Sequence, residues 1–443
     1  MKKIISIALA LLMVAVMLPV MAMADEATTL QSKINEAADG ATITLDNDYT
    51  EDITIDKELT IDLNNHKLTN KEGDTITVNA NGNLTITGNG TVDNVTHGKA
   101  ALSIKENGKA TLNGGYFNRS LENGKSGTEP GGNSFYTLIN HGELIINDGA
   151  VVTTASENSV LGRYSSLVEN GYQSHNGSTN YPTLTINGGT FKGGINTIKN
   201  DDNGITNIYG GKCENYFQAC VQNHHKTTIY NGEFSADVSS AWSVLNCGSC
   251  ASVDAIHDAH ELVIKNGNFK GDVRASVGSV KIEGGNFESS FTQEGDATIE
   301  ISGGTFNTEV TDYVGENTLV VENNGTYHVG DAAQNAVQNA TSGTFTVKKA
   351  KNDTSLTVKS GVTIVNNSDI TITVNDKKVP NGESYTVPGT ITIIVPSDGG
   401  NTTTTPSTDN TKNPSTGAND FVGVAAAMAV VSLLGAAAVI RKK

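Results

Sequence analysis

Four cysteines carry the most varied chemistry in this chain, because a thiol can form a disulfide, bind metal or pack as a small apolar group. They fall within one stretch, at Cys213, Cys220, Cys247 and Cys250. Histidines lie close to them at His224, His225, His257 and His260. Thiolates and neutral imidazoles are Zn²⁺ ligands, but the spacing matches no usual zinc-finger pattern, so we assign no metal site. Disulfides are the alternative, and four cysteines allow three pairings.

An acidic pair, Asp201-Asp202, is the best candidate for carboxylate chemistry. Neighbouring carboxylates can hydrolyse glycosidic bonds, and acidic residues that hold Ca²⁺ beside a basic side chain can serve a lyase. Arginine is scarce, with Arg119, Arg163 and Arg274 alone in the central part of the chain. We expect Asp201 and Asp202 to be solvated in a turn. The sequence therefore assigns no catalytic residue and no cofactor, although a site assembled from distant segments would escape this search.

Three long segments, 118–134, 153–181 and 235–260, are predicted to be insertions that break the repeat of the chain, and aromatic residues lie in the last two of them. Tyr164, Tyr172, Tyr181 and Trp242 are candidates for stacking on sugar rings. The alternative is that these rings pack their own loops onto the body of the protein.

The first residues have the pattern of a secretory signal peptide. Lys2 and Lys3 precede an uncharged apolar run, and Ala22 and Ala24 are the small residues that signal peptidase accepts. We predict cleavage after Ala24, with an uncleaved anchor as the alternative. In an exported chain disulfides are favoured over free thiols.

An apolar segment near the other end, from Phe421 to Ile440, has no charged residue and is long enough to cross a bilayer as a helix. Arg441, Lys442 and Lys443 follow it, and basic residues after an apolar span keep that end in the cytoplasm. The chain before Phe421 is therefore expected outside the membrane.

A short motif, Asn413-Pro414-Ser415-Thr416-Gly417, lies just before this span. The order of motif, apolar span and basic tail resembles the sorting signal of sortase-anchored Gram-positive surface proteins, whose usual motif is Leu-Pro-x-Thr-Gly; Asn413 departs from it. The resemblance implies that a sortase attacks the bond between Thr416 and Gly417 and joins the chain to peptidoglycan. Pro414 favours an extended, kinked presentation of the motif. An ordinary single-pass anchor is the alternative.

The composition is that of a turn-rich β protein, with 47 glycines, 5% aromatic residues and one tryptophan. The formal net charge of −17 disfavours contact with nucleic acid, so no nucleic-acid partner is expected.

One phrase recurs along the chain and sets the expected fold. Its fullest form runs from Leu184 to Phe191, with a short alternating strand, a glycine pair and a large apolar residue. The apolar anchors Phe191, Cys213, Phe234, Phe269, Phe287 and Phe306 follow one another, mostly at about 18 to 22 residues. This period, with turns that need positive φ, is typical of the coils of a parallel β-helix. A two-sheet sandwich of many short strands is the alternative.

A second repeat places asparagine in successive coils. Asn140, Asn200, Asn223 and Asn246 each follow apolar residues in a similar phrase, and stacked amides can hydrogen-bond from coil to coil. We expect Leu184, Ile186 and Phe191 to face the interior.

The rung pattern between Thr42 and Phe306 resembles that of the right-handed parallel β-helix surface proteins that share their fold with pectate lyases. This resemblance is specific for fold and weak for activity. Leu30, Ile34 and Ala37 predict a short helix that caps the first coil, and 332–340 predicts a second helix.

The patterns described above divide the chain into predicted regions. The regions are a signal peptide (1–24), the capped β-helix (25–310), a C-terminal cap or small β module (311–396), a wall-spanning Thr/Ser/Pro stalk (397–416), the sorting motif (413–417), a transmembrane segment (421–440) and a basic tail (441–443).

The expected function is that of a secreted, cell-wall-anchored surface protein. Its partners would be a sortase and peptidoglycan, and its β-helix would present a binding face for glycans or for host or neighbouring cells. A polysaccharide lyase or hydrolase and a structural spacer are the alternatives.

Overall fold

The structure is a computed structural model that describes residues 29–96, 98–120, 135–154, 166–172, 179–236, 241–247 and 260–389. The predicted cleavage residues Ala22 and Ala24, the stalk, the sorting motif and the predicted transmembrane segment lie outside these residues. Within the described ranges, no helix is long and apolar enough to cross a membrane.

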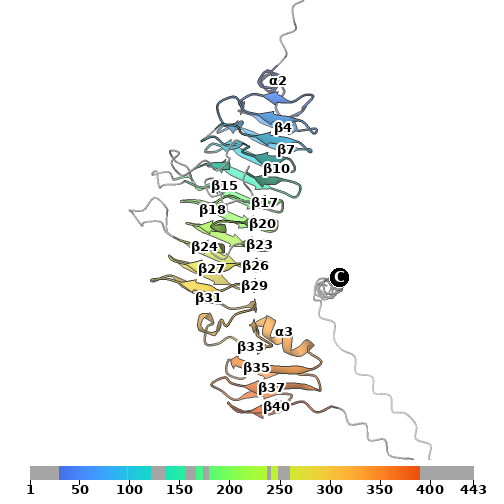
Figure 1. Cartoon of the computed structure of the whole chain (residues 1–443), viewed down its shortest axis with the longest axis vertical. Coiled ribbons are helices and arrows are strands. Elements are labelled where there is room, and N and C mark those ends of the chain that lie inside the picture. The colour runs from blue at the N-terminus through green and yellow to red at the C-terminus, as the bar shows by residue number, and fades with distance from the viewer. Residues whose placement is uncertain are drawn as a thin grey trace, which may run out of the picture. The chain divides into compact units, whose positions relative to one another are not determined.

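The described chain is mostly β and forms long all-parallel sheets, consistent with the predicted parallel β-helix (Figure 1). Three sheets, named here A, B and C, each receive one strand from every coil except the last, which has no strand in sheet C, and the strands follow in that order along the chain. Every pair of neighbouring strands within the coils is parallel, because each coil winds in the same direction as the one before it. Such neighbouring strands lie about 4.8 Å apart.

Sheet A has 11 strands. They are β1 (Ala41–Thr44), β4 (Glu58–Asp62), β7 (Asn83–Thr87), β10 (Lys109–Leu112), β13 (Glu143–Ile146), β16 (Thr183–Ile186), β19 (Ile205–Ile208), β22 (Lys226–Ile229), β25 (Glu261–Ile264), β28 (Ser279–Ile282) and β31 (Thr298–Ile301).

Sheet C has 10 strands. They are β3 (Ile53–Ile55), β6 (Ile76–Val78), β9 (Leu102–Ile104), β12 (Tyr136–Asn140), β15 (Ser166–Asn170), β18 (Asn196–Asn200), β21 (Ala219–Asn223), β24 (Trp242–Asn246), β27 (Asp272–Ala275) and β30 (Phe291–Gln293). The strand β15 corrects the prediction that 153–181 is one insertion, because β15 pairs in register with β12 and β18.

Sheet B runs through the coils and continues beyond them. Its coil strands are β2 (Tyr49–Thr50), β5 (Lys67–Thr69), β8 (Thr91–Asp93), β11 (Tyr116–Asn118), β14 (Val151–Thr153), β17 (Thr190–Lys192), β20 (Lys212–Asn215), β23 (Glu233–Ala236), β26 (Asn268–Lys270), β29 (Asn286–Glu288) and β32 (Gly304–Phe306).

The coils end where β32 pairs antiparallel with the next strand of sheet B. The remaining elements are η2 (Thr311–Tyr313), β33 (Val320–Asn323), β34 (Thr326–Val329), α3 (Asp331–Asn339), β35 (Gly343–Lys349), β36 (Ser355–Leu356), β37 (Val362–Asn366), β38 (Ile372–Val374), β39 (Lys377–Val379) and β40 (Ser384–Thr386). They surround a second apolar core, and α3 confirms the helix expected over 332–340.

The helix α2 (Leu30–Glu36) covers the open end of the first coil, as the sequence predicted. Leu30 and Ile34 are buried against the solenoid core. The Glu51 carboxylate accepts hydrogen bonds from the backbone N–H groups of Leu30 and Gln31, at 2.8 and 3.1 Å. These bonds satisfy helix donors that would otherwise have no partner.

The interior of the coils follows the predicted register. Leu184, Ile186 and Phe191 are fully buried, and Cys213 occupies the position of Phe191 one coil later. Further along, Phe234, Phe269, Phe287 and Phe306 stack with ring centroids 4.6–5.0 Å apart. Gly189 and Gly211 turn the chain between sheets A and B with φ of 93° and 100°, which a side chain would strain.

An asparagine ladder lines the turn from sheet C to sheet A. The amide of each asparagine donates to the next, from Asn140 through Asn170, Asn200 and Asn223 to Asn246, at 2.7–2.9 Å. The ladder confirms the predicted row and adds Asn170, which lies within the segment predicted as an insertion.

Candidate functional site

The outer face of sheet C is unusual in its middle coils because it is buried. In β15, β18 and β21 every residue is buried, whereas strands of sheet A alternate between buried and partly exposed residues. Alternation is expected of a sheet with one solvated face, so both faces of sheet C are covered here. Its outward polar side chains therefore need hydrogen-bond or ionic partners.

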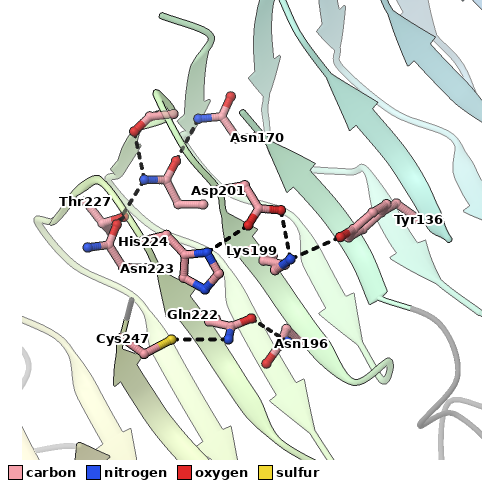
Figure 2. Close-up of polar contacts among 12 residues, drawn as sticks. Tyr136, Asn170, Asn196, Lys199, Asp201, Gln222, Asn223, His224, Thr227 and Cys247 are labelled. Carbon is pink, nitrogen blue, oxygen red and sulfur yellow. Dashed lines mark hydrogen bonds and ion pairs between the residues drawn. The ribbon is translucent and has the colours of Figure 1, made fainter. Parts of the chain in front are cut away.

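A cluster of acid and base side chains occupies this covered face (Figure 2). Glu169 on β15 and Lys199 on β18 are direct register partners. The Lys199 Nζ atom lies 2.9 Å from Asp201 Oδ2 and 3.2 Å from the Tyr136 hydroxyl. On the other side of Asp201, His224 Nδ1 lies 2.9 Å from Oδ1. All five side chains are at most 5% exposed.

The two carboxyl groups of this cluster have opposite pKa shifts. Burial raises the pKa of Glu169 well above its ordinary value, and the negative charge of Asp201 adds to that effect. Burial also opposes ionisation of Asp201, but the charge of Lys199 and a hydrogen bond from His224 outweigh it and lower the pKa of Asp201. Two carboxyl groups in one buried site do not both ionise easily, so protonation is favoured at Glu169 over Asp201.

The burial of Asp201 and Asp202 shows that the prediction of solvated acids was wrong. Their exposed fractions are 0% and 1%. The turn that carries them follows β18 on the covered face of sheet C, where Asp201 accepts positive partners instead of water. The cluster combines the Glu169 and Asp201 carboxyl groups with the Lys199 amine, which is suitable chemistry for cleaving a polysaccharide, but its burial closes it to a substrate.

The candidate arginines have local partners. Arg119 is buried and its Nε donates to the Lys99 carbonyl at 2.8 Å. Arg274 donates to Glu294 at 2.6 Å and lies over the Trp242 ring, 5.0 Å from its centroid. Arg163 lies outside the described residues.

The predicted sugar-stacking aromatics divide into buried and exposed members. Tyr172 is 9% exposed and its ring stacks on His141 at 4.8 Å. It therefore packs onto the body of the protein, as the alternative interpretation of these rings expects. Trp242 is covered on one face by the Arg274 guanidinium. Tyr181 is 53% exposed and remains available, while Tyr164 lies outside the described residues.

The cysteines fall into an interior pair and an outer member. Cys213 and Cys220 are both buried in the coil interior, and the Cys213 thiol donates to the Cys220 carbonyl at 3.4 Å. Cys247 directly follows β24 and is partly exposed, and Gln222 Nε2 donates a hydrogen bond to its sulfur at 3.3 Å. These three thiols are free in the structure, Cys250 lies outside the described residues, and the disulfides stay a prediction. Among the described side chains, no group of three or more His, Cys, Asp or Glu could hold a metal ion.

A second candidate site lies on the exposed corner between sheets A and B. The residues that directly follow the sheet A strands form a row, called here the corner row, that climbs from coil to coil: Asn113, Asn147, Asn187, Tyr209, Tyr230, Lys265 and Glu283. Its three asparagines are linked by hydrogen bonds between their side-chain amides, at 2.6 and 2.7 Å. The rings of Tyr209 and Tyr230 stack at 4.4 Å and are 47% and 39% exposed.

A groove of about 370 Å³ begins next to these tyrosines. Its floor is formed by the glycines that turn each coil, which leave backbone atoms uncovered, and its polar groups come from lysine, glutamate and asparagine side chains. The lining residues are Gly189, Gly210, Gly211, Lys212, Asn231, Gly232, Glu233 and Asn268. Sequence analysis missed this site, although aligning the coils on their strands would have placed Tyr209 directly before Tyr230.

A larger polar groove of about 1100 Å³ lies beside the last coils and α3, and no aromatic residue lines it. Comparison with family models, with curated proteins and with solved structures finds no match for this chain. The function is therefore argued from the residues and their geometry.

Proposed function

We propose that this protein is exported, anchored to the cell wall of a Gram-positive-type bacterium, and binds glycans through its β-helix. The signal-peptide pattern before Asp25 and the sorting motif before Phe421 support export and anchoring. We also infer that the coils wind right-handed, in the manner of pectate lyases, because parallel crossover connections almost always have that hand.

The observation that carries glycan binding is the stacked, exposed pair Tyr209 and Tyr230 beside the glycine-floored groove. Tyrosine offers a sugar an apolar ring face and a hydroxyl, so large exposed tyrosines favour ligands that are partly apolar and rich in hydroxyl groups. The groove adds amide, ammonium and carboxylate groups for hydrogen bonds.

The charge of the groove favours a neutral glycan. Lys212 Nζ lies 2.8 Å from the Glu214 carboxylate, so its charge is neutralised locally. The chain as a whole has a formal charge of −17, which repels polyanions. Neutral or N-acetylated polysaccharides are therefore the proposed ligand class.

An enzyme is the second candidate, favoured by the presence of Glu169, Asp201 and Lys199 in one cluster. The burial of all three side chains argues against cleavage of a polysaccharide there. Product analysis after incubation with the bound glycan separates the two functions, because a binding protein leaves the chain length unchanged.

Binding is tested with the purified mature protein on an array of neutral polysaccharides. The double variant Tyr209→Ala/Tyr230→Ala is expected to lose at least about tenfold in affinity, since stacked aromatic contacts dominate such sites. Tyr116→Ala is the matched control, because Tyr116 is 39% exposed, like Tyr230, but lies on another coil and outside the groove. No binding to any glycan, or equal losses in both variants, contradicts the proposal.

Anchoring is tested separately in the producing cell. Thr416→Ala is expected to move the protein from the wall fraction into the medium or the membrane, because the sortase would lack its cleavage site. A variant that still requires a wall hydrolase for release would exclude sortase anchoring at this motif.

A further inference from the structure

We propose that the groove beside Tyr209 and Tyr230 and the larger groove beside α3 are two parts of one trough, which holds a single extended glycan chain lengthwise along the coils. This proposal rests on the proposed function and adds the form of the ligand. The ligand is a linear, neutral, β-1,4-linked polysaccharide whose consecutive sugars contact consecutive coils.

One row of exposed side chains on sheet B lines both grooves. Each member is the direct register partner of the next, on the successive strands β20, β23, β26, β29 and β32 (Figure 1). Lys212, Glu233 and Asn268 line the smaller groove, and Asn286 and Thr305 line the larger one. The row therefore continues without a break from one groove into the other.

Two contacts cross the junction between the grooves. The Asn286 side-chain amide donates a hydrogen bond to Asn268 Oδ1 at 3.0 Å. At the corner, Lys265 Nζ lies 2.6 Å from Glu283 Oε2, and Glu283 lines the larger groove. Side chains of neighbouring coils thus bond to one another along the axis of the coils, which is the direction in which the trough runs.

Glycine forms the floor of both grooves. Gly211 and Gly232 in the smaller groove have φ of 100° and 142°, and Gly285 and Gly304 in the larger groove have φ of 109° and 120°. A side chain would be strained at each position. Because these residues have no side chain, a ligand can approach the backbone closely at the same place in successive coils.

One end of the trough reaches the C-terminal elements. A side chain at Gly330 would collide with the Ser302 carbonyl, so the start of α3 lies directly on the corner of the last coil. Asp331 and Gln334 of α3 line the larger groove, together with Lys351 from the segment before β36. These elements therefore supply a wall of the site as well as covering the last coil.

The length of the trough sets the length of the ligand. The two grooves cross the sheet B strands from β17 to β32, which belong to six successive coils. At about 4.8 Å per coil, the trough is roughly 24 Å long. An extended β-1,4-linked sugar unit is about as long as one coil spacing, so the trough holds about six units, one per coil.

The test is calorimetric titration of the mature protein with oligomers of β-1,4-linked glucose and of β-1,4-linked N-acetylglucosamine, from two to eight units long. In at least one series the affinity is expected to rise at least about tenfold from the three-unit to the six-unit oligomer and then to level off. Binding that depends on Tyr209 and Tyr230 but does not rise beyond three units overturns the trough and leaves the proposed function standing. Absence of binding in both series also overturns the trough, whereas the polysaccharide array decides the proposed function.

A pair of variants locates the ligand in the trough. Asn268→Ala/Asn286→Ala removes polar groups at the junction and is expected to lose about tenfold in affinity for the six-unit oligomer. Lys270→Ala/Glu288→Ala is the matched control, because these residues are exposed register partners on the same two strands but line neither groove. It should stay within about twofold of the wild type. Circular dichroism verifies folding, and equal losses in the two folded variants, or no loss in the asparagine variant, overturn the trough.

Discussion

Replacing Asn200 by alanine tests whether the asparagine ladder stabilises the coils. The Asn200 amide donates to the Asn223 side chain at 2.9 Å and to the carbonyls of Gly204 and Lys226 at 2.8 and 3.0 Å. Its oxygen accepts from Asn170 and Thr206 at 2.8 and 2.7 Å. The substitution therefore removes five hydrogen bonds, four of them buried and one partly buried.

The loss of stability depends on which partners of Asn200 keep another hydrogen bond after the substitution. Each lost bond is worth about 1 kcal/mol net, and a buried group left without a partner costs about 1–3 kcal/mol. Asn223 keeps the hydrogen bond from Thr227 at 2.7 Å, and Asn170 keeps one to Thr206 at 3.1 Å. We therefore expect Asn200→Ala to lower the free energy of unfolding by about 3–5 kcal/mol.

The assay is urea denaturation of the mature protein, with hydrogen exchange to localise the loss to β18, β21 and their neighbours. Asn187→Ala is the matched control, because Asn187 also belongs to an amide row but is exposed, with its 2.7 Å bond to Asn147 open to water. It should cost about 0.5 kcal/mol or less. Equal losses in the two variants would refute the role assigned to the buried ladder.

Other expectations concern the core, the cap and the thiols. Phe191→Ala should cost about 3–5 kcal/mol in the same denaturation assay, and Phe217→Ala, 37% exposed, should cost little; similar costs would contradict the register. A hydrogen bond from Tyr49, then one from Lys33, lowers the pKa of Asp46 from 3.8 to about 2, so its stabilisation is present above pH 3.8 and lost as pH falls toward 2. Asp46→Asn should remove that acid dependence from hydrogen exchange in α2, and an unchanged profile would exclude this cause. Thiol titration of the denatured, unreduced protein should give fewer than four thiols, and a full count rules out the disulfides.

The sequence predicted the parts of the fold that repeat at a regular spacing. Glycine turns and apolar anchors such as Phe191 recur with each coil, so they reveal the register directly. The strand β15 escaped this reasoning because long segments on both sides of it break the spacing. The burial of Asp201 could not be predicted either, since it depends on coverage of the outer face of sheet C, which no local pattern encodes.

The two candidate sites should act independently because they lie on different sides of each coil. Every coil runs through sheets A, B and C in turn, so the corner between A and B lies across the interior from sheet C. Lys199→Arg should therefore leave glycan affinity within about twofold, because coils couple mainly to their stacked neighbours. Tyr209→Ala/Tyr230→Ala should lose that affinity while the buried cluster stays intact. If Lys199→Arg abolishes binding in a folded variant, the cluster on sheet C contacts the ligand and the corner row does not account for recognition.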